Sequence, residues 1–262
     1  MSGSVRALAA AVLVVAGLTG CASPSSSPGG RATAQGIRLT ASLDSPVDIT
    51  LRWRGRAPGG AAGRIVEFAT APEGPWTVLQ YVPLSQTSYR HPDLMPTTPF
   101  HYRVRPYYGP ASRAVDVRLP EGRFSEAEQK KDHRWAEPVA RPQPGVRTHP
   151  VSASATGSAA GPASAASAAP SGLRAAVMAA NGIRFTWTDH ASDERGQLLE
   201  DRPRGSRSFR PVAVLDPDIT SFGLITLPEE KHAAYRVRAF RYGPASNVVR
   251  LTTGRAPSGS GG

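Results

Sequence analysis

The stretch Tyr-Gly-Pro-Ala-Ser occurs at residues 108–112 and again, unchanged, at residues 242–246. Glycine supplies backbone freedom and proline fixes one backbone dihedral, so both copies are typical of a chain reversal. Each copy follows a Tyr-Arg-Val-Arg stretch, and each of these stretches is preceded by an earlier segment that ends in tryptophan. The repeat therefore predicts a duplicated domain, in which the pentapeptide is the turn between the last two strands.

Short stretches of alternating apolar and polar residues surround both copies. Residues 49–53 place Ile, Leu and Trp on one face, and residues 183–187 repeat this pattern in the second block. Period-two alternation puts one face in a core and the Arg and Thr face in water. Few segments show a helical period, so the sequence predicts an all-β protein. Further strands are predicted at residues 37–41, 65–68, 76–79, 102–105, 115–118 and 235–238.

These features resemble the fibronectin type III family. The matching features in the first block are Trp53, the apolar positions between Leu94 and Val104, and the Gly-x-x-Ser turn that follows. Residues 187–196 of the second block are similar to the Trp-Thr-Asp-x-Ser-x-Glu-x-Gly stretch that is common in bacterial members.

The resemblance covers residues 36–120 and 172–253, and it implies two fibronectin type III-like (immunoglobulin-like) β-sandwiches. The family's corner tyrosine falls at Phe100 and at Ala233, so the hydroxyl that pins this corner is missing from both domains. Because the fold supports many unrelated roles, the resemblance implies little about function.

The first 20 residues have the features of a lipoprotein signal peptide. Arg6 is their one charged residue, and an apolar run follows that is too short for a comfortable membrane span. The run ends in Leu-Thr-Gly before Cys21, the one cysteine in the chain, which resembles a bacterial lipobox. We therefore expect lipidation of Cys21 and an exported protein held at the cell envelope, at the outer membrane if the host is Gram-negative.

Composition divides the remaining chain. Residues 21–35 are predicted to form a disordered tether, residues 121–171 a long Ala/Ser/Pro-rich linker, and residues 254–262 a disordered tail. Within the linker, a capping box predicts a short helix over residues 125–135. Trp135 would dock this helix either on its own protein or on a partner, because an isolated helix of this length is marginal in water.

The net charge of +11 comes mainly from arginine. It is spread along the chain, whereas a nucleic-acid reader concentrates its charge and adds aromatic platforms, so we expect no nucleic-acid partner. A mild attraction to anionic envelope polymers is consistent with the charge.

No catalytic, metal or cofactor motif is found in the sequence. The six histidines lack metal-ligand spacing. Asp189, Asp193 and Glu194 crowd one loop, but the loop lacks the ligand alternation of a calcium loop, so we expect turn caps there. We therefore predict a protein that is not an enzyme and that has neither a cofactor nor a metal.

Two non-catalytic classes of function remain for two tethered modules, and an enzyme with an unrecognised site is the third hypothesis. The first is protein–protein interaction or scaffolding through sheet edges, with Trp135 as an anchor. The second is binding of a carbohydrate or envelope polymer, for which exposed aromatic side chains would be needed. The weak candidates for ligand contacts are Trp76, Tyr107, Tyr108, Trp135 and Tyr242.

Overall fold

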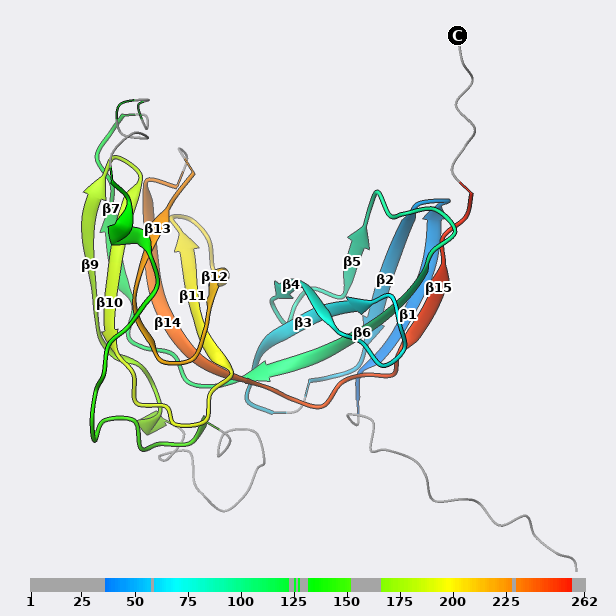
Figure 1. The fold of residues 1–262 in the computed structure, drawn as a ribbon, viewed down its shortest axis with the longest axis horizontal. Helices are drawn as coiled ribbons and strands as arrows, with labels where there is room; N and C mark the ends of the chain where they lie inside the picture. The colour runs from blue at the N-terminus through cyan, green and yellow to red at the C-terminus, as the bar shows by residue number, and fades with distance from the viewer. Residues whose placement is uncertain are drawn as a thin grey trace, which may run out of the picture. The chain divides into compact units, whose positions relative to one another are not determined.

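The computed structural model describes residues 36–57, 59–122, 125, 127, 132–151, 166–227 and 230–255, all within one compact unit, Ala32–Gly262. The predicted signal peptide (1–20), the tether (21–35) with Cys21, and the end of the tail lie outside these residues, as do residues 152–165 of the predicted linker. The predicted all-β class with two β-sandwiches is confirmed (Figure 1).

The first sandwich packs a sheet of order β1-β2-β5 against a sheet of order β15-β6-β3-β4. Its core includes Trp53, whose indole N–H donates to the Gln86 carbonyl at 3.0 Å. The strands are β1 (Arg38–Ser45), β2 (Asp48–Arg54), β3 (Ala61–Ala69), β4 (Thr77–Val82), β5 (Ser88–His91), β6 (Pro99–Tyr108) and β15 (Val249–Thr252).

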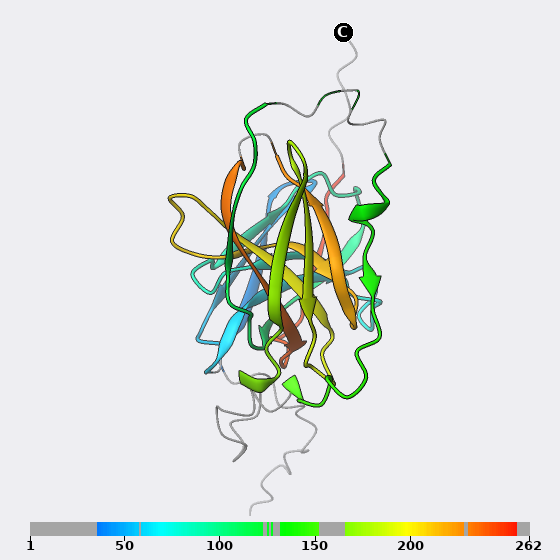
Figure 2. The same cartoon turned by 90° about the vertical axis from the view of Figure 1, so that its left-hand side faces the viewer.

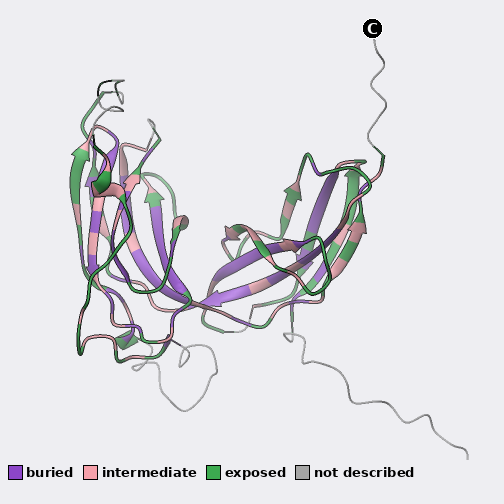
Figure 3. Cartoon of the chain, in the orientation of Figure 1, coloured by how far each residue is buried: buried purple, intermediate pink, exposed green. Residues whose placement is uncertain are grey.

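The second sandwich packs a sheet of order β8-β13-β10-β9 against a sheet of order β7-β14-β11-β12. Its core is built around Trp187, Phe185 and Tyr235. In both sandwiches, residues coloured as buried run along strands of the sheets (Figure 3). The strands are β7 (Val115–Arg118), β8 (Val139–Ala140), β9 (Ser171–Ala179), β10 (Gly182–Thr188), β11 (Gly196–Pro203), β12 (Arg210–Leu215), β13 (Ile219–Ile225) and β14 (His232–Tyr242).

The two sandwiches exchange their last strands. β7 follows β6 along the chain, but it pairs with β14, and Val117 lies in the core of the second sandwich. β15 follows β14, but it pairs with β6, and Val249 and Leu251 pack on the core of the first sandwich. The chain therefore crosses between the sandwiches after β6 and crosses back after β14 (Figure 1).

The prediction that each Tyr-Gly-Pro-Ala-Ser copy is a turn between two strands of one domain is therefore wrong. β6 and β14 pair with each other at their ends, where Tyr108 lies opposite Arg241 and Tyr107 opposite Tyr242. Each strand therefore ends beside the other sandwich, and the pentapeptide carries the chain across. At this close approach a side chain on Gly109 would collide with the Ala239 carbonyl oxygen.

A third apolar cluster joins the sandwiches. Ile65 and Tyr107 from the first half pack with Leu198 and Phe240 from the second. The sandwiches are thus not the separate contiguous domains predicted at residues 36–120 and 172–253, because each takes its last strand from the other block and both contribute to this shared core.

The segment 132–151, which we call the strap, packs on the second sandwich (Figure 2). β8 pairs with β13, and the 3-10 turn η1 (Arg134–Ala136) places Trp135 over two glycines. A β-carbon on Gly182 or Gly223 would lie 2.7 Å from the Trp135 ring, so both glycines are needed to seat this indole. At the end of the strap, Val151 is fully buried.

The predicted linker of residues 121–171 is therefore wrong over the strap, which is part of a sandwich. Most of the predicted helix at residues 125–135 lies outside the described residues, and its last two residues form the start of η1. The predicted tail also begins too early, because the Gly254 N–H donates to the Pro46 carbonyl at 2.7 Å. Across the described part of the chain, no helix has both the length and the apolar character needed to cross a bilayer.

Candidate functional site: an arginine-lined pocket

Two of the predicted contact residues are inside the protein. Tyr107 and Tyr108 keep only 2% and 1% of their surface exposed, because they lie where β6 meets β14. Neither ring can serve as an exposed platform for a ligand. A third candidate, Trp135, is half-buried on the glycines of the second sandwich, so it anchors the strap to its own protein.

The other two candidates meet in one pocket. Trp76 lies just before β4, and Tyr242 ends β14, yet both line the same hollow of about 380 Å³ beside the crossing. Four arginines share its wall, and none of them was predicted from the sequence as a site residue. The lining residues are Glu67, Trp76, Val78, Arg103, Arg105, Arg195, Arg241 and Tyr242.

Arg103 is fixed from two sides. Its guanidinium carbon lies 4.0 Å from the centre of the Trp76 ring, and its Nε donates to Glu67 Oε2 at 2.6 Å. Glu67 is buried, and Glu67 and Arg103 are cross-strand partners on β3 and β6. The pair therefore holds one planar guanidinium rigidly at the pocket wall.

Tyr242 holds two further guanidinium groups. The guanidinium carbons of Arg105 and Arg195 lie 4.4 Å and 5.9 Å from the centre of its ring. Arg105 also donates from Nε to the Gly243 carbonyl at 3.1 Å. Arg195 is exposed. The Tyr242 hydroxyl lies 3.2 Å from that of Tyr81, which fixes the ring that both arginines face.

The fourth guanidinium connects the pocket to the strap. Arg241 Nη1 lies 2.5 Å from Asp193 Oδ2, and the other oxygen of this carboxylate accepts the Val151 N–H at 2.6 Å. Asp193 was predicted as a turn cap; here it binds one arginine of the pocket and the end of the strap.

The pocket carries an excess of positive charge. Among the described residues, four guanidinium groups face two carboxylates, those of Glu67 and Asp193, which leaves two positive charges in excess. Burial lowers the pKa of Arg105, against the opposing effect of Glu67. A desolvated guanidinium group favours an anionic partner, so this pocket is suited to an anion.

The second half repeats the framework of this site. Glu200, Phe209, Arg236 and Arg238 each lie 133 positions after Glu67, Trp76, Arg103 and Arg105, respectively. The Arg236 guanidinium carbon is 4.0 Å from the Phe209 ring centre, and its Nε donates to Glu200 at 2.5 Å. Here Arg238 is buried, with two of its nitrogens on Glu200 and a third on the Gly109 carbonyl. Arg236 and Phe209 do not line the pocket, so they provide matched controls for Arg103 and Trp76.

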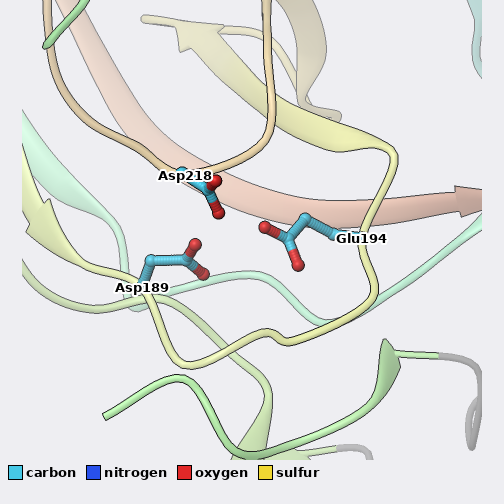
Figure 4. Close-up of side chains that lie close together, drawn as sticks. All are labelled: Asp189, Glu194 and Asp218. Carbon is cyan, nitrogen blue, oxygen red and sulfur yellow. The ribbon is translucent and has the colours of Figure 1, made fainter. Parts of the chain in front are cut away.

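A separate acidic cluster lies at the end of the second sandwich. Carboxylate oxygens of Asp189, Glu194 and Asp218 lie within 4.8 Å of one another, and the three groups face each other (Figure 4). The Arg147 guanidinium contacts all three, at 3.2 Å from Asp189 and 2.9 Å from Glu194. A single cation from the strap therefore faces three carboxylates and offsets part of their charge.

Burial raises the pKa of Asp189 to about 6, and the nearby Glu194 carboxylate adds to this effect. Asp189 Oδ1 also accepts the Ala191 N–H at 3.0 Å, which is the turn-capping role predicted for it. Only Asp189 and Glu194 of the three predicted loop acids belong to the cluster, which is completed by the distant Asp218.

A larger hollow, of about 530 Å³, lies where the first crossing meets residues 166–173. It contains a Ser171–His190 pair with the hydroxyl oxygen 2.7 Å from Nε2. Among the described residues, no carboxylate is bonded to the other ring nitrogen of His190, so the pair lacks the third group of a nucleophilic triad. Its lining is mostly small side chains, and we therefore favour the arginine pocket.

No family model matches the sequence, and no curated protein matches it. Solved structures similar to this chain include a two-domain fibronectin type III segment of chicken tenascin, at 13% identity over 83% of this chain and 98% of that one, with a TM-score of 0.25. The FN1–FN3 domains of chicken CNTN1 are similar at 15% identity over 84% of this chain and 67% of that one, with a TM-score of 0.24. At such low TM-scores, the architecture described above stands on the strand pairing of this chain alone.

Proposed function

We propose that this chain is a lipid-anchored, non-catalytic protein of the cell envelope that binds an anionic envelope polymer. Export and anchoring rest on the signal-like residues 1–20 and on Cys21. The binding role rests on one observation: Trp76, Tyr242 and four arginines, from segments far apart in sequence, line a single pocket. Of the two non-catalytic classes of function that the sequence leaves open, this geometry favours polymer binding over scaffolding.

Both halves of the chain contribute residues to the pocket, because the chain crosses between the sandwiches. Arg103 and Arg105 come from β6, while Arg241 and Tyr242 come from β14. The end-to-end pairing of these strands brings the two groups together. The protein therefore presents one composite binding unit, where the sequence predicted two independent modules on a flexible linker.

A protein partner remains a second candidate because of a different groove. The edge strands β4 and β12 border a hollow of about 460 Å³ lined by Val78, Leu79, Val212, Val214 and neighbouring residues. Within the described residues, each of these strands pairs with a single neighbour, so its other edge could accept an added strand there.

The test is affinity electrophoresis of the mature protein in gels that contain soluble peptidoglycan fragments, lipopolysaccharide or a neutral glucan. We expect retardation by the anionic polymers and none by the glucan. Arg195→Gln should reduce the retardation. Arg202→Gln is the matched control, because Arg202 is likewise exposed and faces an aromatic ring, that of Phe209, at 4.8 Å. Equal migration of wild type in all gels would refute polymer binding.

A further inference from the structure

We infer that the arginine pocket recognises a phosphomonoester carried on a sugar, in preference to a carboxylate or a neutral sugar. This inference rests on the proposed function and names the chemical class of its ligand. The ligand group is a tetrahedral oxyanion with close to two negative charges at neutral pH.

Charge balance is the first argument. The pocket has two guanidinium groups more than it has carboxylates, as counted above. A carboxylate or a sulfate ester would compensate one of the two, whereas a phosphomonoester carries about −1.5 to −2 and compensates both. Because Arg105 is partly desolvated, a ligand that neutralises both excess positive charges is favoured at this pocket.

The arrangement of N–H groups is the second argument. A guanidinium presents five N–H groups in a planar fork. Arg103 directs Nε to Glu67, and Arg105 directs Nε to the Gly243 carbonyl. Arg105 Nη1 also lies 3.9 Å from Glu67 Oε1. Among the described residues, the terminal nitrogens of Arg103 and Arg105 make no hydrogen bond to the protein, and both side chains line the pocket, so these nitrogens are donors for a ligand. Arg195 lines the same pocket and adds a third fork, so three guanidinium groups supply donors for the several oxygens of a tetrahedral anion.

The aromatic rings provide the third argument. Sugar-binding sites use open aromatic faces, but here Arg103 covers one face of Trp76, and Arg105 and Arg195 both face Tyr242. The rings therefore serve to position guanidinium groups by cation–π contact. Recognition in this pocket is then directed at the charged group, and the sugar ring occupies the part of the pocket, about 380 Å³ in total, that the phosphate does not fill.

The test is isothermal titration of the mature protein with four probes at pH 7.5: glucose 6-phosphate, glucose 6-sulfate, glucuronate and glucose. The sulfate ester has the same shape as the phosphate but one charge less, so it separates charge from shape. We expect glucose 6-phosphate to bind about tenfold more tightly than glucose 6-sulfate, as one additional charge contact would give. Glucuronate should be weaker than glucose 6-phosphate, and glucose should give no heat.

Two matched pairs of variants locate the binding. Arg103→Lys should weaken glucose 6-phosphate binding at least about tenfold, because lysine cannot form the bidentate fork or the same stack. Arg236→Lys removes the equivalent contacts from Glu200 and Phe209 but should leave binding unchanged. Arg195→Gln should weaken binding without a loss of thermal stability, and Arg202→Gln should do neither.

The outcomes separate this inference from the proposed function. Equal or tighter binding of glucuronate or glucose would overturn the phosphate assignment while leaving polymer binding in place. Phosphate binding that is equally sensitive to Arg236→Lys and Arg103→Lys would also overturn the assignment to this pocket. Binding of glucose 6-phosphate with no retardation by any polymer would support the phosphate inference and refute polymer binding.

Discussion

The hydroxyl oxygen of Ser246 accepts a hydrogen bond from the backbone N–H of Val104 at 3.0 Å. Ser112 does the same for Val237 at 3.1 Å, so the last residue of each repeated pentapeptide is bonded to the final long strand of the other half. Backbone bonds reinforce both contacts, because the Ser246 and Ser112 N–H groups donate to the Val104 and Val237 carbonyls at 2.8 Å. This reciprocal pair locks the strand exchange.

Replacement of this lock should destabilise the whole protein. Ser246→Ala leaves the buried Val104 N–H without its hydroxyl acceptor, and we expect a loss of about 1–3 kcal/mol in the free energy of unfolding. The measurement is urea unfolding followed by both fluorescence and circular dichroism. Ser206→Ala, at an exposed turn, is the control and should change stability by less than about 0.5 kcal/mol. A loss confined to one of two separate transitions would show that the sandwiches unfold independently.

A chain break between residues 152 and 165 should leave the protein assembled. An engineered protease site there separates β1–β8 from β9–β15, but each fragment supplies a strand to the sandwich of the other. We expect the cleaved protein to elute at the volume of the intact chain in size-exclusion chromatography and to separate only in denaturant. Elution as two smaller species without denaturant would contradict the exchange.

The pH dependence of stability should carry a contribution from Asp189. Its pKa is raised from 3.8 to about 6 in the folded protein, so the folded state binds this proton more tightly than the unfolded state does. The resulting contribution is therefore fully present below about pH 4 and is lost as pH rises through 6, with an upper size of about 3 kcal/mol.

Asp189→Asn removes this titration and keeps an oxygen for the Ala191 N–H. Relative to wild type, the variant should gain stability at pH 7.5 and lose that gain toward pH 4, as measured by urea unfolding at both values. A difference between the two proteins that does not change with pH would show that Asp189 does not titrate in this range.

The seat of Trp135 offers a local test. Gly223→Ala places a methyl group 2.7 Å from the Trp135 ring, so the indole and η1 must move away from the sheet. We expect a red shift of the tryptophan emission and faster proteolysis of the strap. Gly59→Ala also introduces a methyl group at a glycine, but into open space and without a positive φ, and should leave both properties unchanged. Unaltered emission in Gly223→Ala would mean that Trp135 does not rest on this glycine.

Local alternation predicted several strands in both blocks, because a period-two pattern of apolar and polar residues can be recognised within each segment alone. The exchange could not be predicted in this way. β7 follows one Tyr-Arg-Val-Arg strand, β6, but pairs with the other, β14. Because these two strands have the same local sequence pattern, that pattern cannot indicate which of them is the partner. The repeat therefore indicates a duplication, but it does not indicate which copy of the repeated strand pairs with β7.

The candidate site was predicted only in part for the same reason. Trp76 and Tyr242 were named as aromatic candidates, but their proximity depends on the pairing of β6 with β14. Tyr107 and Tyr108 were named on the same grounds and are buried by that pairing. The alternation assigned Arg103 and Arg105 to the water-facing side. They alternate with the buried Tyr102 and Val104, but their side chains keep only 21% of their surface exposed. The alternation gave no sign that Glu67 and the aromatic rings fix their orientation.

The first and last strands of the fold lie together in one sandwich. Asn247, just before β15, accepts from the Leu39 N–H at 2.9 Å and donates to its carbonyl at 3.0 Å. In mechanical terms, a pull on the chain ahead of β1 is transmitted through this clamp to β15, and from there through the crossing into the second sandwich. Because the pull reaches the second sandwich through exchanged strands and not through a free linker, we expect the two sandwiches to resist extension together.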